Sequence, residues 1–374
     1  MSGWSGMGKR KGIVLSLADV FCGGKTCLSG IVDVKWGKDS ISSIPSFASG
    51  GSINMKIVIL ERNSVGEDVS VACLSDFGQV TAYGNTVTAE EVRDRVRDAD
   101  IVIANKSPMC EATLKDAPNV KLICEFATGY DNCDLAYCNA RGIKVANVRD
   151  YCTAMVAQHT FTMALALSQK LFHYDTYVKS GAYSAQDRFS NFDIPFYELE
   201  GKTWGIVGMG NIGRRVAKIA AAFGCRVIFY SITGKSTCTE YCQVDKEMLL
   251  SESDFLSLHC PLSELSRHFI DAAALECMKN TAVLLNVARG AVVDNMALYQ
   301  ALMEGKIAAA GLDVLEKEPL DAAHPLCSIR DSNRLLVTPH LAWASVEART
   351  RCVQEAYRNI EAFLQGGARN LVVS

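Results

Sequence analysis

Short apolar runs alternate with segments of helical periodicity from residue 55 to residue 147. The segment Thr88-Ala89-Glu90-Glu91 forms a capping box, and Val92, Val96 and Ala99 follow it with the spacing of one helix face. Strands that alternate with helices predict a parallel sheet. We expect its five strands in the runs Lys56 to Leu60, Val80 to Tyr83, Ile101 to Asn105, Lys121 to Glu125 and Ile143 to Asn147.

A second alternation follows a helix predicted over Thr153 to Gln169. Its six apolar runs are Trp204 to Val207, Val227 to Tyr230, Phe255 to His259, Ala282 to Val287, Ala308 to Val314 and Leu335 to Thr338. The loop Gly208-Met209-Gly210-Asn211-Ile212-Gly213 lies between the first of these runs and a helical stretch, as in the first turn of a Rossmann sheet. The last periodic segment, Ser345 to Leu364, has no strand after it and is expected to return to the first sheet.

These patterns predict an α/β protein of two domains, a flavodoxin-like substrate domain and a doubly wound Rossmann domain for a dinucleotide. The chain has 374 residues, enough for two hydrophobic cores. We expect the substrate domain in residues 55–152 and 343–374, the Rossmann domain in residues 153–342, and the ligand cleft between them. Residues 1–54 are rich in glycine, serine and lysine and predict a disordered or non-native leader, with Met55 as the natural start.

Charge and composition narrow the choice of ligand. The net charge of -3 and the absence of a basic block weigh against nucleic acid or an anionic membrane surface as a partner. No apolar run reaches the roughly 18 residues that span a bilayer. The 15 cysteines are scattered and odd in number, which predicts free thiols in a reducing, cytoplasmic compartment. Cys238 and Cys242 have ligand-like spacing but no second pair nearby, so no metal site is expected.

The glycine loop predicts a dinucleotide cofactor. Gly208 allows a tight turn, Gly210 lets the backbone approach a pyrophosphate, and Gly213 lets the helix pack close to the strand. Ser231 ends the next strand, where an acidic residue normally binds the adenosine ribose. A carboxylate there would repel a 2′-phosphate, whereas Ser231 with Lys235 nearby can accept one. NAD is the expected cofactor, and NADP is feasible.

Three polar residues at the ends of late strands are candidates for catalysis: Arg289, Glu318 and His340. Taken singly, each more often has a solvated or structural role. Reduction of a 2-keto acid needs a cation for the carboxylate and the polarised carbonyl, a proton donor, and a carboxylate that keeps the donor protonated. Arginine, histidine and glutamate supply these three parts, so their combination predicts a keto-acid reductase.

Six ordered motifs between Met55 and the C-terminus resemble those of the D-isomer-specific 2-hydroxyacid dehydrogenase family. They are the glycine loop, Val156 to Thr160, Ser257 to Leu262, Asn286 to Asp294, Gly311 to Pro319 and Thr338 to His340. The resemblance implies that His340 is the acid/base, Glu318 its carboxylate partner and Arg289 the substrate clamp. It also implies a homodimer.

The same resemblance implies the remaining contacts. Asn211 and Ile212 would meet the pyrophosphate, the cofactor wall would include His259, Cys260 and Pro261, and Val287, Ala288 and Asp313 would lie along the cofactor, the last two by the nicotinamide. The turn Ala127-Thr128-Gly129 would offer backbone N–H groups to the substrate carboxylate. His159, among the apolar residues of its helix, is expected to pack in the core.

Residues near the acid/base bear on the substrate. Tyr151-Cys152-Thr153 and Leu341-Ala342-Trp343 look most like the glycerate dehydrogenase (hydroxypyruvate reductase) branch of the family. A Trp343 that lines the site would restrict it to hydroxypyruvate or glyoxylate, whereas the alternative is a tryptophan that packs at the domain interface. Glu318 argues against formate dehydrogenase, which carries glutamine at the matching place. Another D-2-hydroxyacid dehydrogenase, or a nicotinamide-sensing corepressor like the C-terminal binding proteins, is the alternative function.

Overall fold

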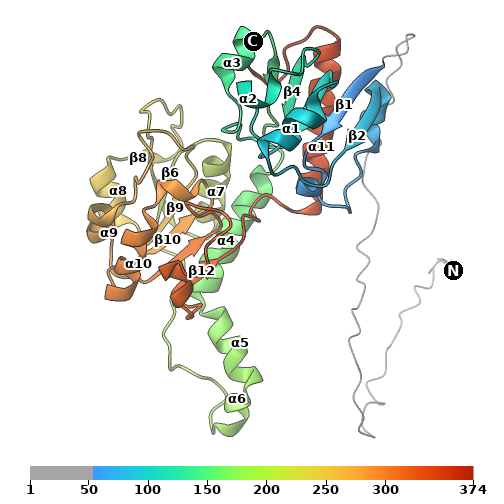
Figure 1. Ribbon diagram of the computed structural model, residues 1–374. Helices are drawn as coiled ribbons and strands as arrows, with labels where there is room; N and C mark the ends of the chain where they lie inside the picture. The colour runs from blue at the N-terminus through green and yellow to red at the C-terminus, as the bar shows by residue number, and fades with distance from the viewer. Residues whose placement is uncertain (1–53, 374) are drawn as a thin grey trace, which may run out of the picture. The chain divides into compact units, whose positions relative to one another are not determined.

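The computed structural model describes residues 54–373 (Figure 1). Apart from Asn54, the leader expected over residues 1–54 lies outside the described residues. The described chain contains two sheets, one built from the first five strands and the last, and the other from the seven strands between them. This mixed α/β architecture with mostly parallel strands confirms the predicted fold class.

The first sheet has six strands in the order β13-β5-β4-β3-β1-β2. The first five strands pair in parallel and are β1 (Met55–Ile59), β2 (Gly78–Ala82), β3 (Ile101–Ala104), β4 (Leu122–Glu125) and β5 (Lys144–Ala146). Their order, 2-1-3-4-5, is the flavodoxin-like order. The sixth strand, β13 (Leu371–Val373), pairs antiparallel with β5. The expectation of five strands, with none after the last helix, was therefore wrong, because so short an apolar run has no readable period.

Short helices connect the strands of this sheet. They are η1 (Arg62–Val65), η2 (Ala72–Phe77), α1 (Ala89–Val96), α2 (Glu111–Leu114) and α3 (Leu135–Ala140). The capping box predicted for α1 is confirmed, because Oγ1 of Thr88 accepts a hydrogen bond from the Glu91 N–H at 3.1 Å and Oε2 of Glu91 accepts one from the Thr88 N–H at 3.1 Å. Val92, Val96 and Ala99 are buried, as their spacing predicts.

Three consecutive helices lead to the second sheet: α4 (Thr153–Ser168), α5 (Leu171–Lys179) and α6 (Ala182–Ala185). The first packs against α7 (Asn211–Ala222) and the second sheet. By contrast, α5 and α6 contain no buried residue and extend away from the sheets (Figure 1). The apolar pattern of this segment predicted neither helix.

The second sheet has seven strands in the order β12-β11-β10-β9-β6-β7-β8, and all of its pairs are parallel. Its strands are β6 (Thr203–Val207), β7 (Arg226–Tyr230), β8 (Cys242–Gln243), β9 (Phe255–Leu258), β10 (Val283–Asn286), β11 (Ala309–Leu312) and β12 (Leu335–Val337). Counted within the sheet, this is the Rossmann order 3-2-1-4-5-6 with a seventh strand added. The six predicted strands are all present. The two-residue edge strand β8 was missed because both of its residues are exposed.

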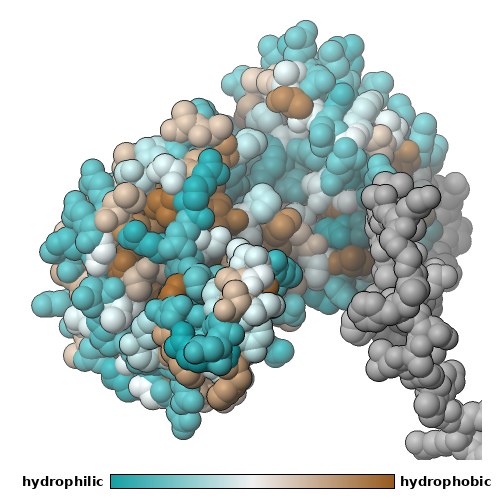
Figure 2. Space-filling view, turned by 90° about the horizontal axis from the view of Figure 1, so that it is seen from below, coloured by the Kyte–Doolittle hydropathy of each residue, from teal (hydrophilic) through white to brown (hydrophobic). Residues whose placement is uncertain are grey.

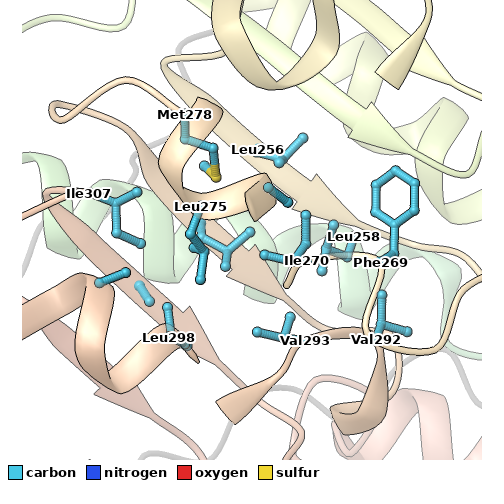
Figure 3. Close-up of a cluster of buried hydrophobic side chains, with 14 of the residues drawn as sticks. Leu256, Leu258, Phe269, Ile270, Leu275, Met278, Val292, Val293, Leu298 and Ile307 are labelled. Atoms are coloured by element: carbon cyan, nitrogen blue, oxygen red, sulfur yellow. The ribbon is translucent and has the colours of Figure 1, made fainter. Parts of the chain in front are cut away.

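Helices on this sheet complete a dinucleotide-binding fold. Besides α7 they are α8 (Lys246–Glu252), α9 (Ala272–Cys277), η3 (Gly290–Val292), α10 (Asn295–Glu304) and η4 (Pro325–Ser328). Figure 3 shows part of their core, where Leu256 and Leu258 of β9 lie near Leu275 of α9 and Leu298 of α10. These side chains are almost fully buried, and burial of each stabilises the fold by about 2 kcal/mol.

The last long helix, α11 (Val346–Leu364), lies beside the first sheet (Figure 1) and packs against β4 and the short helices η1 and η2. Ser345 caps its N-terminus by accepting a hydrogen bond from the Ala348 N–H at 3.2 Å. Its buried face includes Cys352, Val353 and Ile360. After β12 the chain therefore returns to the first sheet, where α11 packs against elements more than 200 positions earlier in the sequence.

Polar and apolar residues are mixed over the face seen in Figure 2. Within residues 54–373, no helix is both long enough and apolar enough to cross a membrane.

Candidate active site

The glycine loop is open to a ligand at its second glycine. Gly208 has a φ of 93°, and a Cβ there would lie 2.9 Å from the amide nitrogen of Cys260. A Cβ at Gly213 would lie 2.2 Å from the Gly208 carbonyl oxygen, so the helix and strand pack too closely for a side chain. A Cβ at Gly210 would meet nothing within 4 Å. Gly210 is also the N-cap residue of α7, and it has no side chain that could accept a hydrogen bond from the first turn of the helix. The N–H groups of Asn211 and Ile212 therefore lie beside open space that an anion can occupy.

His259 follows β9 and lies beside the glycine loop. Its backbone N–H donates to the Val207 carbonyl at 2.8 Å. Both ring nitrogens are shut off from solvent and have no hydrogen-bond partner among residues 54–373. Burial lowers the pKa of the ring to about 3, so His259 is neutral. Because buried polar atoms almost always have a partner, these two nitrogens and the open side of Gly210 fit a bound dinucleotide.

The wall beyond His259 consists of the buried Cys260 and the exposed Pro261. Cys260 is 4 % exposed, and burial raises the pKa of its thiol to about 11. The next residue, Pro261, accepts a hydrogen bond through its carbonyl from Oγ of Ser266 at 2.8 Å. The neutral thiol of Cys260 and the pyrrolidine ring of Pro261, which has no N–H, suit a flat apolar ligand better than a charged one.

No carboxylate stands at the end of β7. Ser231 is half-buried, and its carbonyl accepts the Gly234 N–H at 3.1 Å in a turn that the exposed Lys235 follows. Arg214 on α7 reaches the same segment, where its Nη2 donates to Oγ1 of Thr237 at 3.2 Å. The segment that follows β7 therefore contains one cationic side chain, Lys235, and is contacted by a second, Arg214.

Asp313 organises the loop that carries His340. Its carboxylate is buried and accepts hydrogen bonds from Oγ1 of Thr338 at 2.5 Å and from the N–H groups of Leu341 and Ala342 at 2.7 and 2.8 Å. The His340 N–H donates to the Asp313 carbonyl at 2.8 Å. His340 has a φ of 56°, a left-handed conformation that these bonds hold in place. The motifs around Gly311 and Thr338 thus converge on one loop.

His159 joins this network instead of packing only in the core. Its Nε2 lies 3.0 Å from Oγ1 of Thr338 and 3.5 Å from Oδ1 of Asp313. His159 therefore packs against polar as well as apolar groups, because on a helix its apolar sequence neighbours face other directions.

His340 and Glu318 form a hydrogen-bonded pair. Nδ1 of His340 lies 2.8 Å from Oε2 of Glu318, and Oε1 of Glu318 accepts the Leu315 N–H at 3.0 Å. Burial alone would raise the pKa of Glu318, but the hydrogen bonds from His340 and Leu315 outweigh burial and hold that pKa below its ordinary value. Glu318 is therefore a carboxylate at neutral pH, and Nε2 remains as the ring nitrogen of His340 that faces away from it.

Arg289 lies close to the turn 127–129. A Cβ on Gly129 would lie 2.2 Å from Nη2 of Arg289, and Nε of Arg289 lies 3.6 Å from Oδ2 of the exposed Asp131. The side chain of Asn286, at the end of β10, accepts the Ala288 N–H at 3.1 Å and donates to the Arg289 carbonyl at 3.0 Å. These bonds fix the backbone of Val287, Ala288 and Arg289 at the carboxyl end of the strand.

The turn 127–129 is tied down on its outer side. The Ala127 carbonyl accepts the Val148 N–H at 2.9 Å, and the Thr128 carbonyl accepts Nδ2 of Asn147 at 2.7 Å. In residues 54–373, no group accepts a hydrogen bond from the N–H of Thr128 or of Gly129. Two backbone donors and the Arg289 guanidinium therefore lie together, which is a geometry that can hold a carboxylate.

Trp343 packs edge-on against Tyr151, with ring centroids 6.2 Å apart and an angle of 67° between the rings. Trp343 is half-buried and stands three positions after His340. Two aromatic rings therefore stand close to the His340 loop.

Two buried carboxylates were missed from the sequence. Glu61, which follows β1, accepts the N–H groups of Asn105, Lys106 and Ser107 at 3.0, 3.1 and 2.5 Å. Glu125, which ends β4, is fully buried; its Oε1 accepts hydrogen bonds from Nδ2 of Asn132 and Sγ of Cys133, each at 3.1 Å, and its Oε2 has no partner among residues 54–373. The sequence did contain one signal for these two residues, because each is an acidic residue at the end of an apolar run.

A metal site is not formed by the described residues. In residues 54–373, no three His, Cys, Asp or Glu side chains are grouped so that they could hold a metal ion. Of the pair weighed from the sequence, Cys238 is buried and Cys242 is exposed.

Comparison with known proteins identifies relatives along most of the chain. Residues 161–342 match the model of the D-isomer specific 2-hydroxyacid dehydrogenase, NAD binding domain. A glycerate dehydrogenase of Methylorubrum extorquens is 38% identical over 85% of this chain and 98% of its own length. A hydroxypyruvate reductase of Blautia hydrogenotrophica is 35% identical over 85% of this chain and 99% of its own length. The solved structure of a D-lactate dehydrogenase from Aquifex aeolicus, complexed with NAD and lactic acid, superimposes with a TM-score of 0.73 at 29% identity and covers 85% of this chain and 99% of that one.

Proposed function

This chain belongs to the D-isomer specific 2-hydroxyacid dehydrogenase family, and we propose that within the family it reduces hydroxypyruvate to D-glycerate. It is an NAD(P)-dependent oxidoreductase that acts on a small 2-keto or 2-hydroxy acid. The similarity to both a glycerate dehydrogenase and a hydroxypyruvate reductase supports this substrate, and glyoxylate is the expected second substrate. The corepressor alternative has no comparable support, since these relatives are named as enzymes.

The pair of His340 and Glu318 carries this proposal. With Nδ1 engaged by Glu318 at 2.8 Å, Nε2 of His340 is the proton donor to the keto oxygen. The Glu318 carboxylate stabilises the imidazolium form before the proton leaves. A nicotinamide held in this site would supply the hydride for the keto carbon. In the oxidative direction, the same nitrogen takes the hydroxyl proton.

Arg289 and the turn 127–129 hold the substrate. The guanidinium pairs with the substrate carboxylate and polarises the keto oxygen, and the free N–H groups of Thr128 and Gly129 bind the second carboxylate oxygen. This arrangement orients the keto carbon toward the hydride donor and its oxygen toward His340.

The cofactor is held by the glycine loop and by the wall from His259 to Pro261. Asn211 and Ile212 bind the pyrophosphate through the N-terminus of α7, while Val287, Ala288 and Asp313 border the nicotinamide end. NAD is the proposed physiological cofactor. Ser231, with Lys235 and Arg214 nearby, also admits the 2′-phosphate of NADP.

Trp343 limits the substrate to a short chain. Its contact with Tyr151 supports a wall close to His340 and leaves little room for a bulky group at C3. We propose that the substrate domain comprises residues 55–152 and 343–374 and that residues 153–342 hold the dinucleotide.

A homodimer is proposed from the surface of the segment 171–197, which we call the arm. Eight of its large apolar side chains are exposed: Leu171, Phe172, Val178, Tyr183, Phe189, Phe192, Phe196 and Tyr197. A second copy of the chain is the partner that would cover them. Thirteen cysteines of residues 54–373 are free thiols, which supports a reducing, cytoplasmic location.

A steady-state panel tests the substrate. Hydroxypyruvate, glyoxylate, pyruvate and a branched 2-keto acid would each be reduced with NADH and with NADPH. We expect the largest kcat/KM for hydroxypyruvate and a lower one for the branched acid. A larger kcat/KM for pyruvate or for the branched acid would refute the proposed substrate without affecting the family assignment.

A further inference from the structure

An arginine-lined pocket of about 500 Å³ has a lining that includes neither Arg289 nor the turn 127–129. Three segments form it: the residues after β5, the middle of α11, and the residues just before β13. Its charged lining consists of Arg149, Asp150, Arg351, Glu355, Arg358 and Arg369. Four guanidinium groups and two carboxylates give this lining a net charge of +2 (4 minus 2).

The two carboxylates are already engaged. Glu355 accepts hydrogen bonds from Nη1 of Arg358 and Nη2 of Arg369. Oδ1 of Asp150 accepts a hydrogen bond from Nδ2 of Asn211. In residues 54–373, neither Arg149 nor Arg351 forms an ion pair, since no carboxylate oxygen lies within 4.0 Å of either guanidinium group.

Arg149 and Arg351 are held by their inner nitrogens only. Nε of Arg351 donates to the Tyr151 carbonyl at 2.9 Å, and Nε of Arg149 donates to Oδ1 of Asn147 at 3.3 Å. The terminal nitrogens of both guanidinium groups make no hydrogen bond to the described residues 54–373. Anchored guanidinium forks with free ends match the oxygen pairs of carboxylate and phosphate groups.

We propose that this pocket binds a small dianion, a phosphate monoester or a dicarboxylate, between Arg149 and Arg351. A dianion would balance the net charge of the lining.

The pocket also reaches the cofactor loop. Asp150 bonds to Asn211, the first residue of α7, beside the proposed pyrophosphate site. A bound dianion removes positive potential near that site, so it should weaken NADH binding, and NADH should weaken dianion binding by the same factor. This regulatory part rests on the cofactor site proposed above, whereas dianion binding itself does not.

Calorimetric titration of the full chain with inorganic phosphate and with malonate tests the site. The variants are Arg149→Gln/Arg351→Gln, the single charge reversal Arg149→Glu, and a control, Arg97→Gln/Arg330→Gln, at two exposed arginines elsewhere. Arg289→Gln reports binding in the active site. Thermal unfolding checks that each variant is folded. If the double variant does not fold, Arg149→Glu provides the test, because the Arg149 side chain makes only one long hydrogen bond within residues 54–373.

We expect the dissociation constant of at least one probe to rise about tenfold or more in the double variant and in Arg149→Glu, and to stay unchanged in the control. Binding of phosphate alone assigns a phosphate monoester, and binding of malonate alone assigns a dicarboxylate. The probe should also raise the KM for NADH about fivefold in the wild type but not in the double variant. Absence of binding, equal binding by the double variant, or loss only in Arg289→Gln would overturn the proposal. Dianion binding with an unchanged KM for NADH would remove only the regulatory part.

Discussion

Nδ1 of His340 lies 2.8 Å from Oε2 of Glu318, so the imidazole can offer only Nε2 to a substrate. Replacing His340 by glutamine should lower kcat for hydroxypyruvate by about 10²- to 10⁴-fold, because a positioned proton donor contributes that much. The Kd for NADH, measured by fluorescence titration, should stay within about twofold of the wild type. Retained turnover would exclude His340 as the proton donor.

Glu318→Gln tests the carboxylate separately from the imidazole. Glutamine can still hydrogen-bond to Nδ1 but does not stabilise the positive charge of the protonated ring. The reductive kcat/KM for hydroxypyruvate should therefore fall by about 10- to 100-fold. Steady-state kinetics with NADH measure the loss. A kcat/KM equal to that of the wild type would show that the charge of Glu318 plays no part in turnover.

Gly129 leaves room for the Arg289 guanidinium. A Cβ at position 129 would lie 2.2 Å from Nη2, and the flexible arginine side chain would move aside. Gly129→Ala should therefore leave the unfolding temperature nearly unchanged but lower kcat/KM by about 10- to 100-fold, because a small displacement of a clamp misorients the substrate. In an Arg289→Gln background, the same alanine should have little further effect. Equal losses in both backgrounds would contradict the proposed coupling.

The sequence predicted the parts of the molecule that rest on periodicity and on backbone chemistry. The two parallel sheets followed from apolar runs, and the turn at Gly208 from glycine spacing, since these depend on neighbouring residues. The pairing of His340 with Glu318 was expected from the chemistry of keto-acid reduction and from the family resemblance, and not from a local pattern. No local pattern reports a contact between residues 22 positions apart.

Other features depend on tertiary contacts and could not be predicted. The strand β13 is defined by its partner β5 rather than by its own three residues. The Asp313 carboxylate contacts three groups of the segment that follows β12 and His159 of α4, which only the folded chain brings together. The helices α5 and α6 bury none of their residues, so no apolar stripe marks them.

Glu125→Gln should stabilise the protein at alkaline pH. Burial raises the pKa of Glu125 from its ordinary 4.5 to about 7, against the hydrogen bonds from Cys133 and Asn132. The folded state therefore binds this proton more tightly than the unfolded state. The stability that the group contributes is complete below pH 4.5 and is lost as the pH rises through 7.

The shift corresponds to about 3 kcal/mol in the free energy of unfolding. Glutamine does not titrate, so the difference between Glu125→Gln and the wild type should become more favourable by about that amount between pH 4.5 and pH 8. Urea unfolding at several pH values measures it, with the exposed Glu67→Gln as the control. A difference that does not change with pH would show that Glu125 does not titrate in this range.

Ser231→Asp should shift the cofactor preference toward NADH. A carboxylate at the end of β7 would accept hydrogen bonds from the ribose hydroxyls of NAD but repel the 2′-phosphate of NADP. We expect kcat/KM for NADPH to fall about tenfold or more, while that for NADH changes by less than about threefold. Thr239→Asp adds the same charge at an exposed position farther along the segment and should leave the ratio unchanged. If NADPH use persists in Ser231→Asp, the 2′-phosphate lies elsewhere.

The arm should hold two copies of the chain together. Phe189 and Phe192 are 90% and 74% exposed, and exposed aromatic clusters of this kind are rare on a monomer. Light scattering should give the wild type a mass of twice the 40.6 kDa of one chain. Replacing both phenylalanines by serine should return the mass to that of one chain, because the apolar contact is lost without disturbing a buried core. Val87→Ser removes a side chain that is 82% exposed outside the arm and should remain dimeric. A wild-type monomer, or a double variant that stays dimeric, would refute the arm as the interface.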